Sequence, residues 1–305
     1  MIAHTRAFDP DRHDFEKLWR FLRQDYVQRK DRFVWLVSRL GDWRYGLWTE
    51  KKTIPSFFRN HAQLWVDGFD QPVGCVLSED GGNIFFILTQ SGYDYLYGEI
   101  LDWTVQHWRS RFATLKTEVH EHQRDALAAL EMRGFRSLGV VATTRAYDLL
   151  AKRDEPTGLV PGFHIMDMAE NMDYRSKALL NVNGFGDQGQ VSEFDLLRFE
   201  YSRENPAYDP ALDLSVLTPE GLHVASCVGF ADPANGMAEV EKVCTHNRYR
   251  RQGLAEAVIR ECFHRLRARG SQRAYIPGYS IAANGLYEKL GPCAHKLWHH
   301  YELGA

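Results

Sequence analysis

The sequence predicts an α/β (α+β) protein of two tandem domains, and three observations lead to that prediction. The chain has 305 residues, which is long for one compact domain and comfortable for two. Strand-like and helical patterns alternate, and the same order of elements occurs twice. Between the two runs, residues 152–162 are first charged and then rich in Pro and Gly, which is typical of a linker. We therefore expect domains at 1–151 and 163–305.

In the first half, the helical segments repeat apolar residues every three or four positions, and the strand-like segments are short and bounded by turns. Phe15, Leu18 and Leu22 share one helix face, and Gly134 ends a later helix. An aromatic stretch at 35–48 precedes the first pair of strands. The predicted strands are 2–8, 62–66, 73–77, 83–88, 114–119 and 138–148, and the predicted helices are 14–22, 93–108 and 124–132.

The second half repeats this order after the linker. A predicted strand pair surrounds the turn at 219–221, and Gly291 ends a helix as Gly134 does in the first half. The predicted strands are 163–168, 212–218, 222–230, 239–245, 273–276 and 296–303, and the predicted helices are 173–182, 193–202, 254–263 and 281–290.

The chain is organised around the stretch 239–258, which has the pattern of a strand, a short basic loop and the start of a helix. Gly253 stands where the periodic apolar residues begin, and a glycine there lets the backbone come close to a ligand. The start of a helix offers unpaired N–H groups and the positive end of a dipole, to which Arg250 and Arg251 add charge. This arrangement predicts an anion site of a kind that suits a pyrophosphate.

The loop in this stretch resembles the Arg/Gln-x-x-Gly-x-Gly/Ala signature of the GCN5-related N-acetyltransferases (GNAT). The resemblance implies that each domain is a mixed, mostly antiparallel central sheet flanked by helices. It also implies that acetyl-CoA is bound by backbone N–H groups of the loop, with the pantetheine arm along the preceding strand. The cofactor-binding residues implied are Val243, Cys244, Thr245, Arg250, Arg251, Gln252, Gly253, Leu254 and Ala255.

A second segment, 286–291, looks like the C-terminal Leu-Tyr-Glu-Lys-Leu-Gly segment of the same family. The resemblance implies that Tyr287 is the general acid that protonates the departing thiolate. Asn284, three residues earlier, also occurs in family members and would contact the cofactor. The sequence departs from the family at Ser280, where Asn is frequent, and at Pro292, where Phe is usual.

Acetyl transfer requires a deprotonated amine, and a strand carboxylate can accept its proton. Glu241 resembles the family position that often does this, and in a regular strand it points to the same face as Val243 and Glu239. A charged residue at a strand end that only orients side chains, or pairs with Lys242 or an arginine, remains an equal alternative for Glu241 and the preferred interpretation for Glu239.

The first half lacks this chemistry. No Arg-x-x-Gly-x-Gly/Ala follows its strand 83–88, Asp94 would repel a pyrophosphate, and Leu130 stands where the second half has Tyr287. We therefore expect a degenerate GNAT-like domain that is structural or shapes the acceptor site. The aromatic residues of this half could bind a substrate but more often form core or a domain interface; they are Trp35, Trp43, Tyr45 and Trp48.

Composition limits the remaining functions. The net charge of −3 and the absence of a basic stripe argue against nucleic-acid binding, and no apolar run is long enough to span a membrane. Five scattered cysteines suit thiols in a reducing cytoplasm. The histidines at 120, 122, 295, 299 and 300 lack the spacing of a third metal ligand, so we expect no metal. Cys244 has no neighbour in sequence that would activate it as a nucleophile.

The sequence thus predicts an acetyl-CoA-dependent N-acetyltransferase with its active site in the C-terminal domain. The acceptor is expected to be an amine, by default of a small molecule, and the protein a monomer or homodimer. The alternative is a non-catalytic module that binds or senses acyl-CoA.

Overall fold

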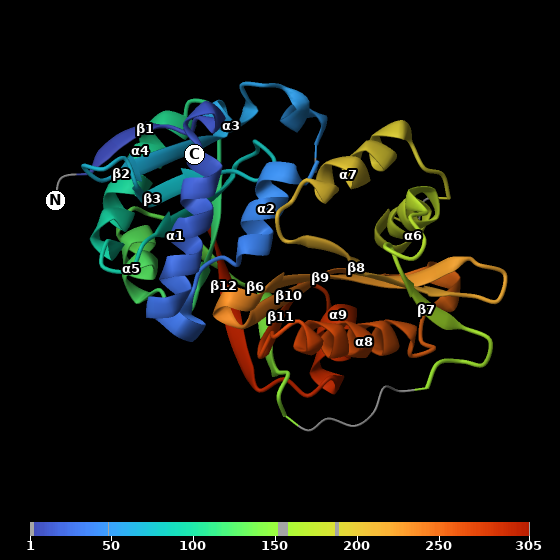
Figure 1. Ribbon diagram of the computed structural model, residues 1–305. Helices are drawn as coiled ribbons and strands as arrows, with labels where there is room; N and C mark the ends of the chain where they lie inside the picture. The colour runs from blue at the N-terminus through green and yellow to red at the C-terminus, as the bar shows by residue number, and fades with distance from the viewer. Residues whose placement is uncertain (1–2, 48, 152–157, 187–188, 305) are drawn as a thin grey trace. The chain divides into compact units, whose positions relative to one another are not determined.

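The computed structural model describes residues 3–47, 49–151, 158–186 and 189–304. Its internal contacts divide the chain into two compact units (Figure 1). Unit 1 comprises Met1–Thr143 and Lys296–Ala305, and unit 2 comprises Thr144–His295.

Unit 1 is built on a sheet with the strand order β1-β2-β3-β4-β5-β12, where β12 is Ala294–Leu303. The neighbours β4 and β5 run parallel, and the other neighbours in this sheet run antiparallel. Helices α4 and α5 pack on the face that presents Val76, Phe85 and Ile87, and α1 lies over the other face (Figure 1). The elements are β1 (His4–Ala7), α1 (Asp14–Arg29), α2 (Val37–Tyr45), α3 (Phe57–His61), β2 (Ala62–Val66), β3 (Pro72–Leu77), β4 (Ile84–Thr89), α4 (Tyr97–Trp108), β5 (Leu115–His120), α5 (Arg124–Met132) and β6 (Arg136–Asp148).

Unit 2 is built on a sheet with the order β6-β11-β10-β9-β8-β7, in which β10 and β11 run parallel. Helix α8 covers one face and helices α6 and α7 lie over the other (Figure 1). The remaining elements are β7 (His164–Asp167), α6 (Tyr174–Gly186), α7 (Glu193–Arg203), β8 (Tyr208–Leu217), β9 (His223–Asp232), β10 (Met237–Thr245), α8 (Leu254–Ala268), β11 (Arg273–Gly278), α9 (Ile281–Lys289) and β12 (Ala294–Leu303).

The last strand of each half joins the sheet of the other half. Strand β12 pairs antiparallel with β5 of unit 1, from Trp298↔His120 to Leu303↔Leu115. Strand β6 starts in unit 1, and its residues from Thr144 onward belong to unit 2. The predicted domains, 1–151 and 163–305, follow the order of the chain, whereas the compact units exchange these strands. Residues 152–157 of the predicted linker lie outside the described residues.

Helix α8 shows why the second unit folds as it does. Its buried residues recur at helical spacing and pack on the apolar face of β8, β9 and β10. Gly229 on β9 lies so close to α8 that a methyl group there would be 2.7 Å from the sulfur of Cys262. The mixed, mostly antiparallel sheets flanked by helices confirm the predicted fold class.

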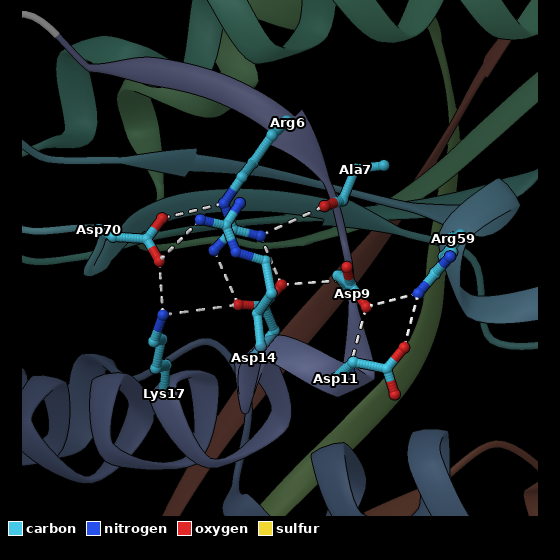
Figure 2. A network of polar contacts seen from close by, with 9 residues as sticks. Arg6, Ala7, Asp9, Asp11, Asp14, Lys17, Arg59 and Asp70 are labelled. Carbon is cyan, nitrogen blue, oxygen red and sulfur yellow. Dashed lines mark hydrogen bonds and ion pairs between the residues drawn. The ribbon is translucent and has the colours of Figure 1, made fainter.

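A network of charged residues fixes the start of unit 1 (Figure 2). Asp14, which is fully buried at the start of α1, accepts two bonds from the guanidinium of Arg6 on β1, at 2.5 and 2.7 Å. Asp70 in the β2–β3 turn accepts from Lys17 at 2.6 Å and from Arg6 at 3.0 Å. The hydrogen bond from Lys17, together with Arg6, lowers the pKa of Asp70 to about 2. The network therefore joins β1, α1 and the β2–β3 turn.

Candidate active site

Strands β10 and β11 separate at their C-terminal ends. Among the described residues they pair only from Met237↔Arg273 to Glu239↔Tyr275, although β10 continues to Thr245 and β11 to Gly278. On its other edge β10 stays paired with β9 as far as Thr245↔Ala225. The gap in pairing leaves the inner edge of β10 available for an extended ligand that binds as an added strand would. The sequence does not reveal this separation.

A bulge in β10 changes the direction of its side chains. Glu241 pairs with Val228 and Cys244 pairs with Ser226, so one extra residue is inserted, and Lys242 has a φ of 54°. Glu241 and Cys244 therefore share a face, on the side of the sheet that α6 covers. Val243 instead packs against the core on the α8 side. The expectation that Glu241 and Val243 share a face holds only for a regular strand, and β10 is not regular.

The loop after β10 presents the start of α8 without a side-chain cap. Arg251 and Gly253 both have left-handed backbones, with φ of 67° and 77°, and Gly253 is the N-cap residue. Within the described chain no side chain caps this helix. Successive amides around left-handed residues form a concave anion site, and the helix dipole adds to it. Gln252 is exposed, Ala255 is half-buried, and Leu254 is buried and anchors the loop in the core.

The loop is also electropositive. Burial lowers the pKa of His246, and the positive charges of Arg248 and Arg250 lower it further. The residues of the loop therefore fit a diphosphate in both geometry and charge.

Arg250 is directed toward the protein itself. Its Nη2 donates to the carbonyl of Gly184 on α6 at 3.1 Å, and its Nε donates to the carbonyl of Thr245 at 3.4 Å. The backbone N–H of Asn247 donates to Oδ1 of Asn183, also on α6, at 2.9 Å. Sequence reasoning missed these α6 residues because the predicted helix 173–182 stops before them. The Asn183-Gly184 pair is of a kind that often ends a helix, whereas α6 continues through it to Gly186.

Tyr287 lies buried on α9, at the C-terminal end of β11. A methyl group on Gly278 would come within 3.2 Å of the Tyr287 ring, and the Tyr147 hydroxyl donates to the Tyr287 carbonyl at 2.7 Å. Burial raises the pKa of the Tyr287 phenol well above its usual value, and the negative charge of Glu241 raises it further. The two predicted catalytic residues are thus electrostatically coupled.

Asn284 is engaged by the protein. Its Oδ1 accepts from Arg145 at 2.7 Å, and Arg145 also pairs with Glu288 at 2.9 Å. Ser280, where the family often has Asn, accepts from the backbone N–H of Ala283 and so caps α9. A cofactor contact for Asn284 stays a prediction. Arg145 was missed because it belongs to β6, which was assigned to the first half.

Cys244 is a packed thiol. Its sulfur lies 3.3 Å from the Ser226 hydroxyl and 3.3 Å from Oδ1 of Asn181. Burial raises the pKa of this thiol, so it stays protonated and is a poor nucleophile at neutral pH.

In unit 1 two neighbouring strands separate in the same way, but the loop that follows is occupied by carboxylate side chains of the protein. In the part of the chain that the structure describes, β4 pairs with β5 only at Ile84 and Phe85, whereas β4 continues to Thr89. In the loop that follows, the N–H of Ser91 is taken by the buried carboxylate of Asp25 at 2.8 Å. Arg29 pairs with both Asp25 and Asp94 at 2.8 Å. Carboxylates therefore stand where a diphosphate would need donors.

The aromatic residues of the first half are mainly core. Trp35 and Trp43 are buried, and the Trp43 indole N–H donates to the carbonyl of Ser78 at 3.0 Å. Tyr45 makes an edge contact with Phe15. Trp48 lies outside the described residues.

The described residues contain neither a candidate metal site nor a candidate membrane-spanning helix. No group of three or more His, Cys, Asp or Glu side chains in the described chain is placed to hold a metal ion. Searched over the same residues, no helix has the length and apolar character that crossing a membrane requires.

Comparison with known proteins gives a family match for part of the chain. Residues 187–291 match the model of the acetyltransferase (GNAT) family. No curated protein matches the chain.

Solved structures that resemble this chain include several that share its fold over nearly its whole length. A GCN5-related N-acetyltransferase from Sphaerobacter thermophilus is 17% identical with a TM-score of 0.64, covering 99% of this chain and 97% of its own. A tandem GNAT protein from the clavulanic acid biosynthesis pathway is 12% identical with a TM-score of 0.65, covering 99% and 98%. A GNAT-family acetyltransferase from Colwellia psychrerythraea is 12% identical with a TM-score of 0.61, covering 98% and 99%. Residues 187–291 therefore match a GNAT domain, and the fold of the chain is like that of tandem GNAT proteins.

Proposed function

We propose that the protein is an acetyl-CoA-dependent N-acetyltransferase whose active site lies in unit 2. The observation that carries the proposal is the gap between β10 and β11, which opens beside the uncapped start of α8 and close to Tyr287. Unit 1 has the corresponding gap, but its loop is filled by Asp25 and its α5 carries the buried Leu130 where α9 carries Tyr287.

Acetyl-CoA would supply the acetyl group as an activated thioester. The backbone of the loop residues from Arg250 to Ala255 would hold the diphosphate, because its amides and charge suit an anion. The edge of β10 at Val243, Cys244 and Thr245 would hold the pantetheine arm, because it lacks β11 as a partner there. The Cys244 side chain itself points toward α6, so its part is that of its backbone.

Glu241 and Tyr287 would divide the proton transfers. Glu241 accepts the proton of the attacking amine, and Tyr287 donates its phenolic proton to the departing sulfur. Burial keeps the phenol protonated at rest, and burial also raises the pKa of a thiol, as it does for Cys244. Once Glu241 is protonated its charge no longer opposes ionisation of Tyr287, so the base makes the acid stronger when it is needed.

The acceptor would be an amine of a small molecule. Glu239 and Glu241 both lie on the face that α6 covers, and carboxylates there favour a cationic group. The α7 helix has no fully buried residue among those described, so its apolar side chains are partly available to an acceptor. All five cysteines are free thiols, which supports our expectation of a cytoplasmic protein, and we expect a monomer or homodimer.

The test is release of CoA from acetyl-CoA with a panel of amines. We expect turnover with at least one amine, and a fall in kcat of about 10²-fold or more in Tyr287→Phe, as for loss of a general acid. Tyr208→Phe is the control, because it also removes a phenol of unit 2, one that is half-buried and donates to Asp213 at 3.0 Å.

Binding is tested separately by calorimetry with CoA. A Gly253→Asp variant, which adds a negative charge and a disfavoured backbone, should lose binding. Tight CoA binding without turnover of any amine would point to a sensing module. Absence of CoA binding, or full binding by Gly253→Asp, would contradict the proposal altogether.

A further inference from the structure

Contacts of Asn183 and Gly184 connect the end of α6 to the end of β10 and the loop that follows it. Asn183 accepts the N–H of Asn247 at 2.9 Å, the Gly184 carbonyl accepts from Arg250 at 3.1 Å, and Gly184 packs directly on Cys244. Asn183 and Gly184 precede residues 187–291, the region that the family model matches. We propose that Asn183 and the carbonyl of Gly184 are positioning groups that hold the cofactor loop in its binding-competent shape, an inference that rests on the function proposed above.

Asn183 controls where the loop turns. It is 8% exposed, so its amide oxygen is held in a mostly water-free environment. The N–H that it accepts belongs to Asn247, the first residue of the short 3₁₀ turn Asn247–Tyr249. That turn leads directly into the extended Arg250 and the left-handed Arg251. Fixing the start of the turn therefore fixes the direction of the amides that follow it.

Arg250 completes the connection from the loop side. The Gly184 carbonyl lies in the last turn of α6, where helix carbonyls lack intrahelical partners and a positive charge is favourable. With two carbonyls as its partners, Arg250 acts mainly by tying the loop to α6 and β10. Arg251, which is exposed and left-handed, is the better placed of the two to act on a diphosphate by charge.

The other end of α6 is anchored, so the helix can serve as a fixed support. Lys177 is buried and pairs with Asp213 at 2.6 Å. Its ammonium also donates to the Leu214 carbonyl at 2.9 Å and to the Ser215 hydroxyl at 3.1 Å. Lys177 and Gly184 are seven residues apart and thus lie on one face of the helix. The same helix covers the face to which Glu241 points, so it links the acceptor side to the cofactor loop.

The first experiment compares Asn183→Ala with Asn205→Ala. Asn205 is also buried, and its Oδ1 accepts the backbone N–H of Ala207 at 3.0 Å, away from the loop. Both variants lose the same kind of hydrogen bond. By calorimetry with CoA, Asn183→Ala should bind about three- to tenfold more weakly, the effect of one hydrogen bond, and Asn205→Ala should bind as wild type. Equal affinities for the two variants would overturn the proposal.

The second experiment separates positioning from charge with two exposed residues that should not affect folding. Arg250→Gln should weaken CoA binding by a factor that stays constant as NaCl rises from about 0.05 to 0.5 M. Arg251→Gln should weaken binding by a factor that shrinks over that range, because a phosphate contact is screened by salt. A loss in Arg250→Gln that disappears at high salt would show that Arg250 acts by charge, which contradicts the positioning role.

A third measurement does not depend on CoA. Amide hydrogen exchange of the unliganded protein should be faster over residues 246–253 in Asn183→Ala and unchanged there in Asn205→Ala. If wild type fails to bind CoA, the proposed function is refuted while this exchange still decides the role of Asn183. Unchanged exchange over 246–253 in Asn183→Ala would overturn that role whether or not CoA binds.

Discussion

Replacing Gly184 by alanine should destabilise unit 2, although the same change in a helix usually stabilises. An added Cβ would lie 2.9 Å from Cβ of Cys244, 3.2 Å from its sulfur and 3.6 Å from the Thr245 nitrogen. Favourable carbon contacts lie at about 3.5–4.0 Å, so α6 must move away from β10 by about 1 Å. Overpacking of this kind costs about 1–3 kcal/mol. The movement also lengthens the bonds from Arg250 and Asn247 to α6.

Gly285→Ala is the matched control. Gly285 also lies within a helix, α9, and apart from the backbone of that helix and the two neighbouring residues no atom of the described chain lies within 4 Å of the position its Cβ would take. Alanine there should therefore give the usual gain of about 1 kcal/mol. The strain at Gly184 offsets that gain, so the two variants should differ in free energy of unfolding by about 1–3 kcal/mol.

Urea denaturation measures this difference, and calorimetry with CoA adds a second readout. We expect the midpoint of Gly285→Ala to rise and that of Gly184→Ala to fall, with weaker CoA binding only in the latter. If both variants are stabilised equally, the contact between α6 and β10 is not as close as the structure indicates, and the support that α6 gives the loop is refuted.

Three further predictions concern charged and titratable groups. Because the pKa of Asp70 is lowered to about 2 from its ordinary 3.8, its carboxylate adds stability above pH 3.8 that is lost as the pH falls toward 2. The free energy of unfolding, measured by urea denaturation at pH values from 5 to 2, should therefore fall less steeply with decreasing pH in Asp70→Asn than in wild type. An equal dependence on pH in the two proteins would contradict this. Lys177→Met should lower the free energy of unfolding by about 3–5 kcal/mol, since it leaves the Asp213 carboxylate buried and unpaired, and a second change, Asp213→Leu, should restore much of it. If the double variant is no more stable than Lys177→Met, the loss has another origin. Iodoacetamide at pH 8 should label the exposed Cys293 long before Cys244, whose thiol pKa is raised by burial, as mass spectrometry of peptides can determine; equal rates would argue against that burial.

The sequence determined the local features of the site. The basic loop that ends in Gly253 and the periodic residues from Leu254 onward predicted the start of a helix, and the structure has it there. Tyr287 was placed on a helix that ends near Gly291, which the structure also has. These features depend on residues close in the chain, where backbone preference and helical spacing are enough.

Pairing between strands could not be predicted in the same way. The exchange of β6 and β12 depends on which sheet edge each strand pairs with. The residues of a strand do not by themselves specify the partner strand. For the same reason, the hydrogen bonds from Arg145 on β6 to α9 could not be predicted from the sequence.

Strand β10 shows most clearly what the sequence predicts and what it does not. Alternation along the sequence assumed a regular strand, whereas the bulge at Lys242 arises from the mismatch in register between β10 and β9. The gap beside β11 and the support from Asn183 and Gly184 likewise depend on segments far apart in the chain. The sequence alone thus determined which residues carry the proposed chemistry, and tertiary structure decided their direction and support, because only packing between distant segments fixes these.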